Sequence, residues 1–281
     1  MSGIKKIKML NQQELIKTSA EIRKIILQKI YLSGSSHIGS CFSAVEVLVA
    51  LYFYALNISP NEPEYPGRDI FIMSKGHAAV ALYATLAQRG FFNADILNDY
   101  GKNGSKIAGH VIAKSLPGIE ATAGSLGHGL PIISGMALAA KINNEDNRKY
   151  FCLLGDGECN EGVVWEAAMF AGQHKLNNLV AIIDFNKQQG LGDSSAIINL
   201  NNMAERWSAF GWEALEVDGH DFKDLSQTLD YFKNKDNDRP SLIIARTIKG
   251  KGVSWMENNV AWHYKSPDEE QYKKALAELS L

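Results

Sequence analysis

Cysteine is scarce in this chain: its 281 residues include three, at spacings that fit no metal site, Cys41, Cys152 and Cys159. An odd number of cysteines, in a chain whose start shows no secretory signal, favours reduced thiols and a cytoplasmic location. Long hydrophobic runs are also missing. The longest, residues 44–58, is interrupted by Glu46 and Asn57 and is too short to cross a bilayer. We therefore expect neither a disulfide framework nor a membrane protein.

No charge of one sign dominates, since 29 basic residues face 31 acidic residues and the formal net charge is -2. A nucleic-acid partner is therefore not expected. The sequence has no internal repeat, no long linker and no Gly-x-Gly-x-x-Gly that opens a helix after the first strand, which argues against a dinucleotide-binding domain. The apolar share, 46%, is normal for a globular chain with a sizeable core.

Apolar periodicity predicts helices that alternate with strands. Helices are expected at residues 12–32, 42–56, 77–88, 131–142, 161–175, 203–210, 222–232 and 268–279. Strands are expected at residues 69–73, 151–154, 179–183, 214–217 and 241–247. This alternation predicts a single α/β domain over residues 1–281, with a parallel central sheet flanked by helices.

The most informative segment is the Gly-Asp-Gly turn around Asp156, which is followed thirty residues later by Asn186. The strand at 151–154, the helix at 161–175 and the strand at 179–183 form one crossover of a parallel sheet. Asp156 and Asn186 then lie at the carboxyl ends of two strands, where open α/β sheets bind ligands.

A carboxylate and an amide oxygen suit Mg²⁺ better than zinc, and Mg²⁺ keeps positions open for phosphate oxygens. Gly157 leaves room for a phosphate beside the backbone, near a helix N-terminus that favours anions. Gly-Asp-Gly alone is a common turn. Together with Asn186 it favours a site for a metal and a diphosphate.

Gly-Asp-Gly, a gap of about thirty residues and Asn resemble the thiamine-diphosphate motif. In order and rough spacing, nearly the whole chain resembles the N-terminal, diphosphate-binding half of a transketolase. The resemblance implies the thiamine-diphosphate-binding fold, and thiamine diphosphate with Mg²⁺ (or Ca²⁺ or Mn²⁺) as cofactors. Other stretches that carry it are Ser36-His37-Ile38-Gly39, Ser74-Lys75-Gly76-His77, Gly109-His110, Gly124-Ser125-Leu126-Gly127-His128-Gly129, Val217-Asp218-Gly219-His220-Asp221, Lys249-Gly250-Lys251-Gly252 and Trp262-His263.

The resemblance assigns roles to four histidines. It implies that His37 faces the sugar hydroxyls, that His110 contacts the first hydroxyl of the donor and that His77 lies over the diphosphate. His263 is implied to contact both the diphosphate and the surroundings of the reacting carbon. Imidazoles suit this chemistry, because cleavage of a ketose removes a proton from a hydroxyl and addition to the acceptor returns one.

The resemblance also implies the remaining site residues. The metal ligands would be the side chains of Asp156 and Asn186 and the backbone carbonyl of Gln188. Glu161 would join a carboxylate network between two cofactor sites, a role that we favour over the alternative of an acid placed there by the helix dipole. The implied cofactor contacts are His77, Gly124, Leu126, Gly155, Asp156, Gly157, Asn186 and His263.

Other residues are assigned no catalytic role. His128 stands where many relatives carry Gln, and its role stays open. Tyr264 stands where relatives usually carry Gly, so it either narrows the substrate channel or folds outward. We expect His220 to be structural, in a strand-to-helix turn, and His174 to lie on a helix surface.

In transketolases, a glutamate that touches the cofactor's pyrimidine ring belongs to a second domain, which this sequence does not resemble. The expected enzyme is therefore split. It would be a heterotetramer with a C-terminal partner subunit, and it would act on sugar phosphate substrates that the sequence does not name. Helix 131–140 and the helix from Glu161 are expected at the interface. The alternatives are a carboligase like deoxyxylulose-phosphate synthase and a non-catalytic regulatory subunit.

Overall fold

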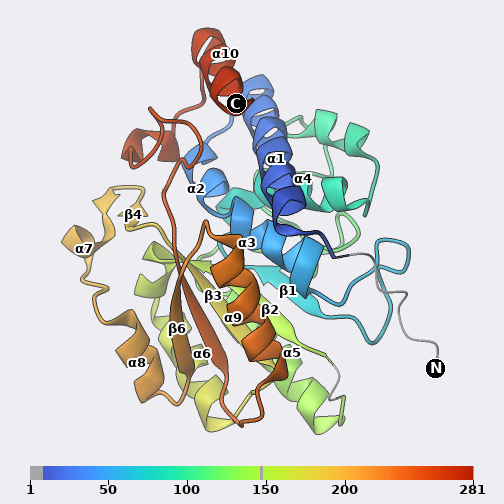
Figure 1. The fold of residues 1–281 in the computed structure, drawn as a ribbon, viewed down its shortest axis with the longest axis vertical. Coiled ribbons are helices and arrows are strands. Elements are labelled where there is room, and N and C mark those ends of the chain that lie inside the picture. The colour runs from blue at the N-terminus through green and yellow to red at the C-terminus, as the bar shows by residue number, and fades with distance from the viewer. Residues whose placement is uncertain (1–8, 146–147, 281) are drawn as a thin grey trace.

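A computed structural model describes residues 9–145 and 148–280. Its centre is a five-stranded parallel sheet in the order β1-β2-β3-β7-β6, as Figure 1 shows. The strands are β1 (Ile70–Met73), β2 (Tyr150–Gly155), β3 (Leu179–Phe185), β6 (Glu213–Asp218) and β7 (Ser241–Arg246). A short antiparallel pair, β4 (Gln188–Gln189) and β5 (Gly192–Asp193), lies apart from it. The predicted α/β architecture with a parallel central sheet is confirmed.

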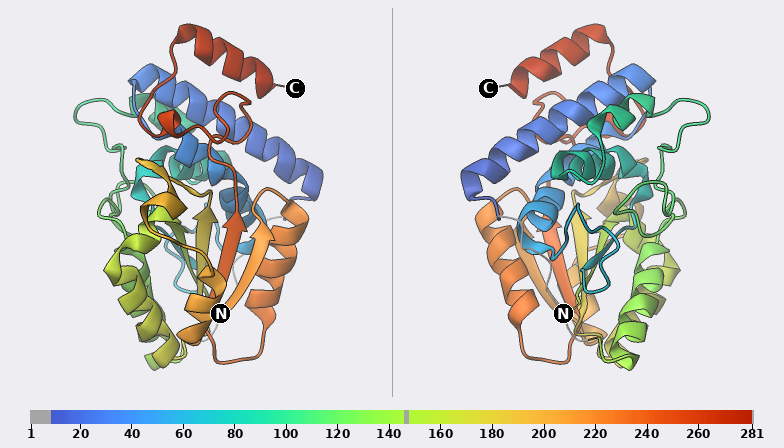
Figure 2. Two further views of the ribbon diagram at one scale, coloured as in Figure 1. Left: turned by 90° about the vertical axis from the view of Figure 1, so that its left-hand side faces the viewer. Right: turned by 90° about the vertical axis from the view of Figure 1, so that its right-hand side faces the viewer.

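Helices cover both faces of the sheet (Figure 2). Successive residues of a strand point to opposite faces, so Phe151 and Leu153 enter one core while Cys152 and Leu154 enter the other. The first core is closed by α1 (Gln12–Ser33), α3 (Val45–Ala50), α4 (Ala79–Arg89) and α9 (Phe222–Asn234). The second is closed by α5 (Gly129–Ile142), α6 (Gly162–Gln173) and α8 (Met203–Ala209).

The long helix α1 agrees with its prediction because both of its ends are encoded locally. Asn11 and Glu14 form a capping box at its start, and Gly34 ends it with a φ of 64°. The terminal helix α10 (Glu269–Glu278) packs against it (Figure 1). The rings of Tyr31 and Tyr272 are stacked between these helices, with their centroids 4.5 Å apart.

The single helix predicted at 42–56 is wrong in detail. The structure has α2 (Ile38–Ser43), then α3, then a π-helical turn η1 (Leu51–Ala55). The break after α2 lies where the Ser43 hydroxyl donates a 2.6 Å hydrogen bond to Asp184 of β3. Such a tertiary contact outweighs helix propensity and leaves no trace in the apolar pattern.

Several elements are too short for periodicity to reveal. They are η2 (Gly76–Ala78), η3 (Ala94–Asp99), η4 (Gly157–Asn160), η5 (Val260–His263) and α7 (Ser194–Ile197). Within the two described ranges, no helix has the length and apolar character needed to cross a membrane.

Candidate active site

Loops that follow the carboxyl ends of the strands converge on one cavity of about 610 Å³. Every residue predicted for the site lines this cavity: His37, His77, His110, Gly124, Leu126, Gly155, Asp156, Gly157, Glu161, Asn186, Gln188 and His263. The parallel sheet explains the convergence, because β1, β2, β3 and β7 all point their carboxyl ends toward the same edge. The structure brings the predicted residues together, while their individual roles remain predictions.

Four histidines from distant parts of the chain form a cluster in the cavity. The ring centroid of His37 lies 5.2 Å from that of His77, 6.2 Å from that of His110 and 5.1 Å from that of His263. His37 has a φ of 74°, a left-handed conformation that costs free energy for any residue except glycine. Its N–H donates to the carbonyl of His263 (2.9 Å), which helps to hold this backbone in place.

Three of these imidazoles are neutral at neutral pH. Burial, with the positive neighbours of the site, lowers the pKa of His37 to about 4 and that of His263 to about 3. Burial also lowers the pKa of His77 well below its usual value. A neutral imidazole offers one donor and one acceptor. The cluster is therefore able to accept and return protons without first losing one.

Lys249, which we did not predict as a site residue, fixes the tautomer of His263. Its ammonium group lies 2.9 Å from Nδ1 of His263 and donates to it, so the imidazole proton lies on Nε2. Lys249 also donates to the carbonyl of Gln188 (3.2 Å). Burial and the charge of Lys75 lower the pKa of Lys249 to about 8. Its place in the Lys-Gly-Lys-Gly stretch was the available sequence clue.

Asp156 carries the features expected of a metal ligand. The residue is 2% exposed, and it accepts hydrogen bonds from the Gly157 N–H (2.7 Å) and the Ser194 hydroxyl (3.1 Å). Burial and the charge of Asp184 raise the pKa of Asp156 to about 6. The charge of Lys75 offsets these effects only in part, and a divalent cation would supply the further positive charge that favours the ionised carboxylate.

The other two predicted ligands offer oxygen donors that line the same cavity as Asp156. The amide of Asn186 donates to Asp184 (3.3 Å), which fixes its orientation, and its oxygen accepts from the Gln188 N–H (3.0 Å). In the described part of the chain, no group of three or more His, Cys, Asp or Glu side chains could hold a metal. Carboxylate, amide and carbonyl oxygens are the donors of a Mg²⁺ site and not of a zinc site.

We predict that Mg²⁺ affinity falls in acid. Because the pKa of Asp156 is raised to about 6, a proton occupies the carboxylate below that pH, whereas Mg²⁺ requires the ionised form. Affinity should be full above about pH 7 and fall about tenfold per pH unit below pH 6. Calorimetric titration of Mg²⁺ with thiamine diphosphate between pH 5 and 8 measures this. Asp156→Asn is the control, because any pH dependence that survives in it belongs to groups other than Asp156, such as the diphosphate or Lys249.

A buried ion pair between Lys75 and Asp184, which the sequence did not reveal, supports the proposed metal ligand Asn186. Asp184 is fully buried and accepts from the ammonium of Lys75, itself 1% exposed, and from the hydroxyls of Ser43 and Thr247. Burial raises the pKa of Asp184, but Lys75 and these hydroxyls outweigh burial and lower it. Asp184 therefore stays ionised and continues to orient Asn186.

The remaining predictions have mixed outcomes. A Cβ atom on Gly157 would lie 2.6 Å from Cγ of Gln189, so this glycine makes room for a side chain of the protein itself. Glu161 is exposed and directly precedes α6. His128 is exposed and is not among the residues that line the cavity.

His220 has the structural role that we expected. Its Nε2 accepts from the Ile248 N–H (2.8 Å), so its Nδ1 carries the proton and donates to Glu46 (2.9 Å). Tyr264 lies over the β4–β5 hairpin, since a Cβ atom on Gly190 would clash with its hydroxyl. It lines the cavity and is 61% exposed, so it forms part of the cavity mouth.

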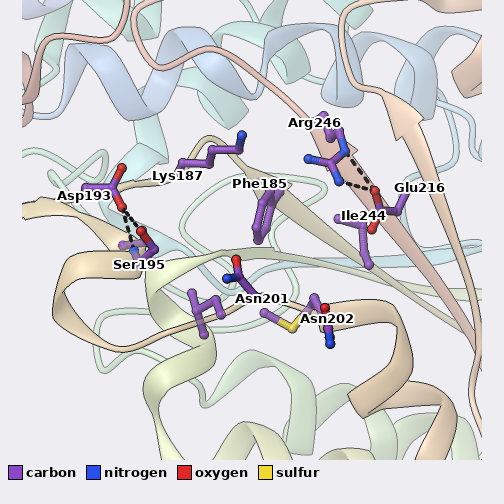
Figure 3. Close-up of a pocket in the computed structure, with 12 residues that line it drawn as sticks. Phe185, Lys187, Asp193, Ser195, Asn201, Asn202, Glu216, Ile244 and Arg246 are labelled. Carbon is purple, nitrogen blue, oxygen red and sulfur yellow. Dashed lines mark hydrogen bonds and ion pairs between the residues drawn. The ribbon is translucent and has the colours of Figure 1, made fainter.

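A smaller pocket of about 330 Å³ lies beside the active-site cavity (Figure 3). Ser194 lines it and donates to Asp156, which lines the main cavity. In this pocket Arg246 forms an ion pair with Glu216, and the Ser195 hydroxyl donates to Asp193. The side chain of Lys187 also lines the pocket. We assign no ligand to it.

Comparison with known proteins identifies the family. A family model described as "Transketolase, thiamine diphosphate binding domain" matches residues 13–279. The chain belongs to the transketolase family. It is similar to a subunit of the apulose-4-phosphate transketolase of Phocaeicola vulgatus, with 44% identity over 93% of this chain and 92% of the relative. It is also similar to the 6-deoxy-6-sulfo-D-fructose transketolase subunit SqwG of a Clostridium species, with 41% identity over 92% of this chain and 93% of the relative.

Longer transketolases match over part of their length. The crystal structure of transketolase from Campylobacter jejuni aligns with a TM-score of 0.89 and 30% identity, covering 97% of this chain and 43% of that enzyme. In sequence and in extent, this member of the transketolase family therefore corresponds to the thiamine-diphosphate-binding subunit of the two-part transketolases. The predicted resemblance is confirmed.

Proposed function

We propose that this subunit binds thiamine diphosphate through Mg²⁺ and, with a partner subunit, transfers a two-carbon ketol unit from a ketose phosphate to an aldose. The observation that carries the proposal is the cavity that Asp156, Asn186 and Gln188 line together with the cluster of four histidines. Thiamine diphosphate supplies the electron sink for the carbanion left when the carbon–carbon bond breaks.

We assign the metal and the diphosphate to two different sets of residues. The side chains of Asp156 and Asn186 and the carbonyl of Gln188 hold the metal. The carbonyl already accepts from Lys249, and its second lone pair remains for the cation. The proposed diphosphate contacts come from His77, His263 and the backbone around Gly124, Leu126, Gly155 and Gly157.

The proton transfers fall to the other histidines. The rings of His37 and His110, whose centroids lie 6.2 Å apart, would remove a proton from a sugar hydroxyl and return it to the product. His263 presents its Nε2–H as a donor, because Lys249 occupies Nδ1. A fixed donor orients the substrate oxygen and does not need to move during the reaction.

His110→Ala and His77→Ala should separate turnover from cofactor binding. His110→Ala removes a group that transfers or holds a proton, so we expect kcat to fall by on the order of tenfold to ten-thousandfold with cofactor affinity kept. His77→Ala should instead weaken thiamine diphosphate binding. Steady-state kinetics and a fluorescence titration of the cofactor measure the two effects. Equal losses of cofactor affinity in both variants would contradict the division of roles.

We propose that the partner binds the outer face of α5 and α6 and that two copies of each chain form a heterotetramer. This face carries exposed apolar side chains, Ile132, Ile142, Met169 and Phe170. An obligate interface resembles a core cut in two, so it requires such a surface. Relatives that are themselves named as transketolase subunits support a second chain.

Met169→Asp should prevent assembly with the partner. It places a charge on the proposed apolar face, where desolvation of the charge opposes association. Size-exclusion chromatography with light scattering should show a mixture of separate subunits in place of the complex. Leu32→Asp, at an exposed leucine of α1, is the matched control and should assemble normally. Normal assembly of Met169→Asp would place the interface elsewhere.

An assay with a panel of donors tests the proposed activity. The subunit and its partner, with Mg²⁺ and thiamine diphosphate, should transfer a ketol unit from ketose phosphates. Activity with pyruvate instead would support a carboligase like deoxyxylulose-phosphate synthase. Absence of turnover with every donor, despite cofactor binding, would support a regulatory subunit. The sugars, the single domain over residues 1–281 and the cytoplasmic location stay predictions.

A further inference from the structure

Glu158 is a buried carboxylate in the site that the proposed function leaves unused. It is 2% exposed and follows directly after the Gly-Asp-Gly turn, within η4. Its Oε1 accepts from the Gly127 N–H (2.7 Å) and from the Ser74 hydroxyl, and its Oε2 accepts from the Gly155 N–H (2.9 Å). Burial raises the pKa of this carboxyl even though all three donors oppose the change.

The three donors belong to three separate segments that surround the active-site cavity. Ser74 follows β1 and precedes His77, Gly127 lies in the Gly-rich loop before α5, and Gly155 ends β2 beside Asp156. Ser74 also accepts from the Gly129 N–H (3.0 Å), which ties the first two segments together a second time. One carboxylate therefore links all three.

The linked segments are packed without spare room. A Cβ atom on Gly76 would clash with the carbonyl oxygen of Ala123, and one on Gly129 would clash with Cβ of Ser74. The segment of Ser74 and Gly76 and the Gly-rich loop of Ala123 and Gly129 therefore have no room to move closer to each other. The arrangement is already complete within this chain, without any residue of a partner.

We infer that Glu158 is a positioning residue that holds these three segments in the arrangement that receives the diphosphate group, so that this chain alone has a preformed site for magnesium diphosphate. The inference rests on the proposed function, since it takes Asp156 as the metal ligand. Chemically, the ligand is a diphosphate with its bound divalent cation, and no pyrimidine ring or sugar is required.

Calorimetric titration of the full chain, without partner, with inorganic diphosphate and Mg²⁺ tests the inference. The parent chain should bind. Glu158→Gln keeps the size of the side chain but replaces one acceptor by an N–H₂ group that faces another N–H donor. We expect binding to weaken by about tenfold to a hundredfold, because buried donors lose their acceptor. Glu166→Gln, the same change at an exposed position of α6, should bind as the parent does.

A merely structural role gives a different pattern. Glu158→Gln would then lower the midpoint of thermal unfolding, while affinity measured well below that midpoint stayed unchanged, and this result would overturn the inference. Absence of binding by the parent would also overturn it. Parent binding that is insensitive to Asp156→Ala contradicts the proposed metal ligand, and with it the proposed function, independently of Glu158.

Ser74→Ala keeps the inference testable if Glu158→Gln does not fold. Ser74→Ala alone should weaken binding, by about threefold to thirtyfold, because it removes one link. In a double variant the two losses should not multiply, because both changes break the same contact. Fully multiplicative losses would show that Glu158 and Ser74 act separately. They would contradict the inference that both residues hold the segments through their shared hydrogen bond.

Discussion

Asp156→Ala should abolish Mg²⁺-dependent binding of thiamine diphosphate. The change removes the only charged side chain among the three proposed ligands. Loss of a residue that merely orients a metal ligand lowers affinity about 10- to 100-fold, so loss of a ligand itself should exceed this. A fluorescence titration of the cofactor in the presence of the partner, at several Mg²⁺ concentrations, measures the effect. Binding equal to that of the parent would show that Asp156 is not a ligand.

The thermal midpoint of the Asp156→Ala variant shows whether its loss of cofactor binding results from unfolding. The raised pKa of Asp156 means that its ionised form is disfavoured in the folded, metal-free chain. A group whose pKa is higher in the folded state destabilises the fold above that pKa, so Asp156→Ala should not lower the thermal midpoint of the free chain at about pH 7.5. Asp236→Ala, at an exposed position, is the control and should bind the cofactor normally.

The fold was largely predictable because its elements are encoded locally. The prediction of α1 followed from its apolar periodicity, and the five strands of the sheet followed from apolar runs between turn residues. The failure at residues 42–56 has a physical cause, because Ser43 forms a hydrogen bond to Asp184, 141 residues away in sequence. A pattern of apolar residues carries no information about such a partner.

The site was predictable where a polar side chain able to bind a metal directly follows a strand. Asp156 and Asn186 follow two strands, and the topology of a parallel sheet brings them to one edge. Lys75, Asp184, Lys249 and Glu158 were missed as site residues. Their importance comes from burial and from partners in other segments, such as the ion pair of Lys75 with Asp184. Sequence spacing alone does not reveal these pairings.

The isolated chain should transfer no measurable ketol unit. The matched region corresponds to 43% of the Campylobacter jejuni transketolase, and relatives that match over nearly their whole length are named as subunits. Within the described cavity, Glu158 already accepts three hydrogen bonds, so it is not available to contact a pyrimidine ring. Glu161, the other glutamate that lines the cavity, has its own implied role in the carboxylate network, so we expect the catalytic glutamate implied by the family to come from the partner.

Titration of the purified chain with its partner tests the two-part enzyme most directly. With Mg²⁺, thiamine diphosphate and a ketose phosphate donor, the rate of ketol transfer should rise from the background and reach a plateau at an equimolar ratio. The chain carrying Asp156→Ala should give no rise at any ratio. A rate for the rigorously purified chain by itself that equals the plateau rate would contradict the account.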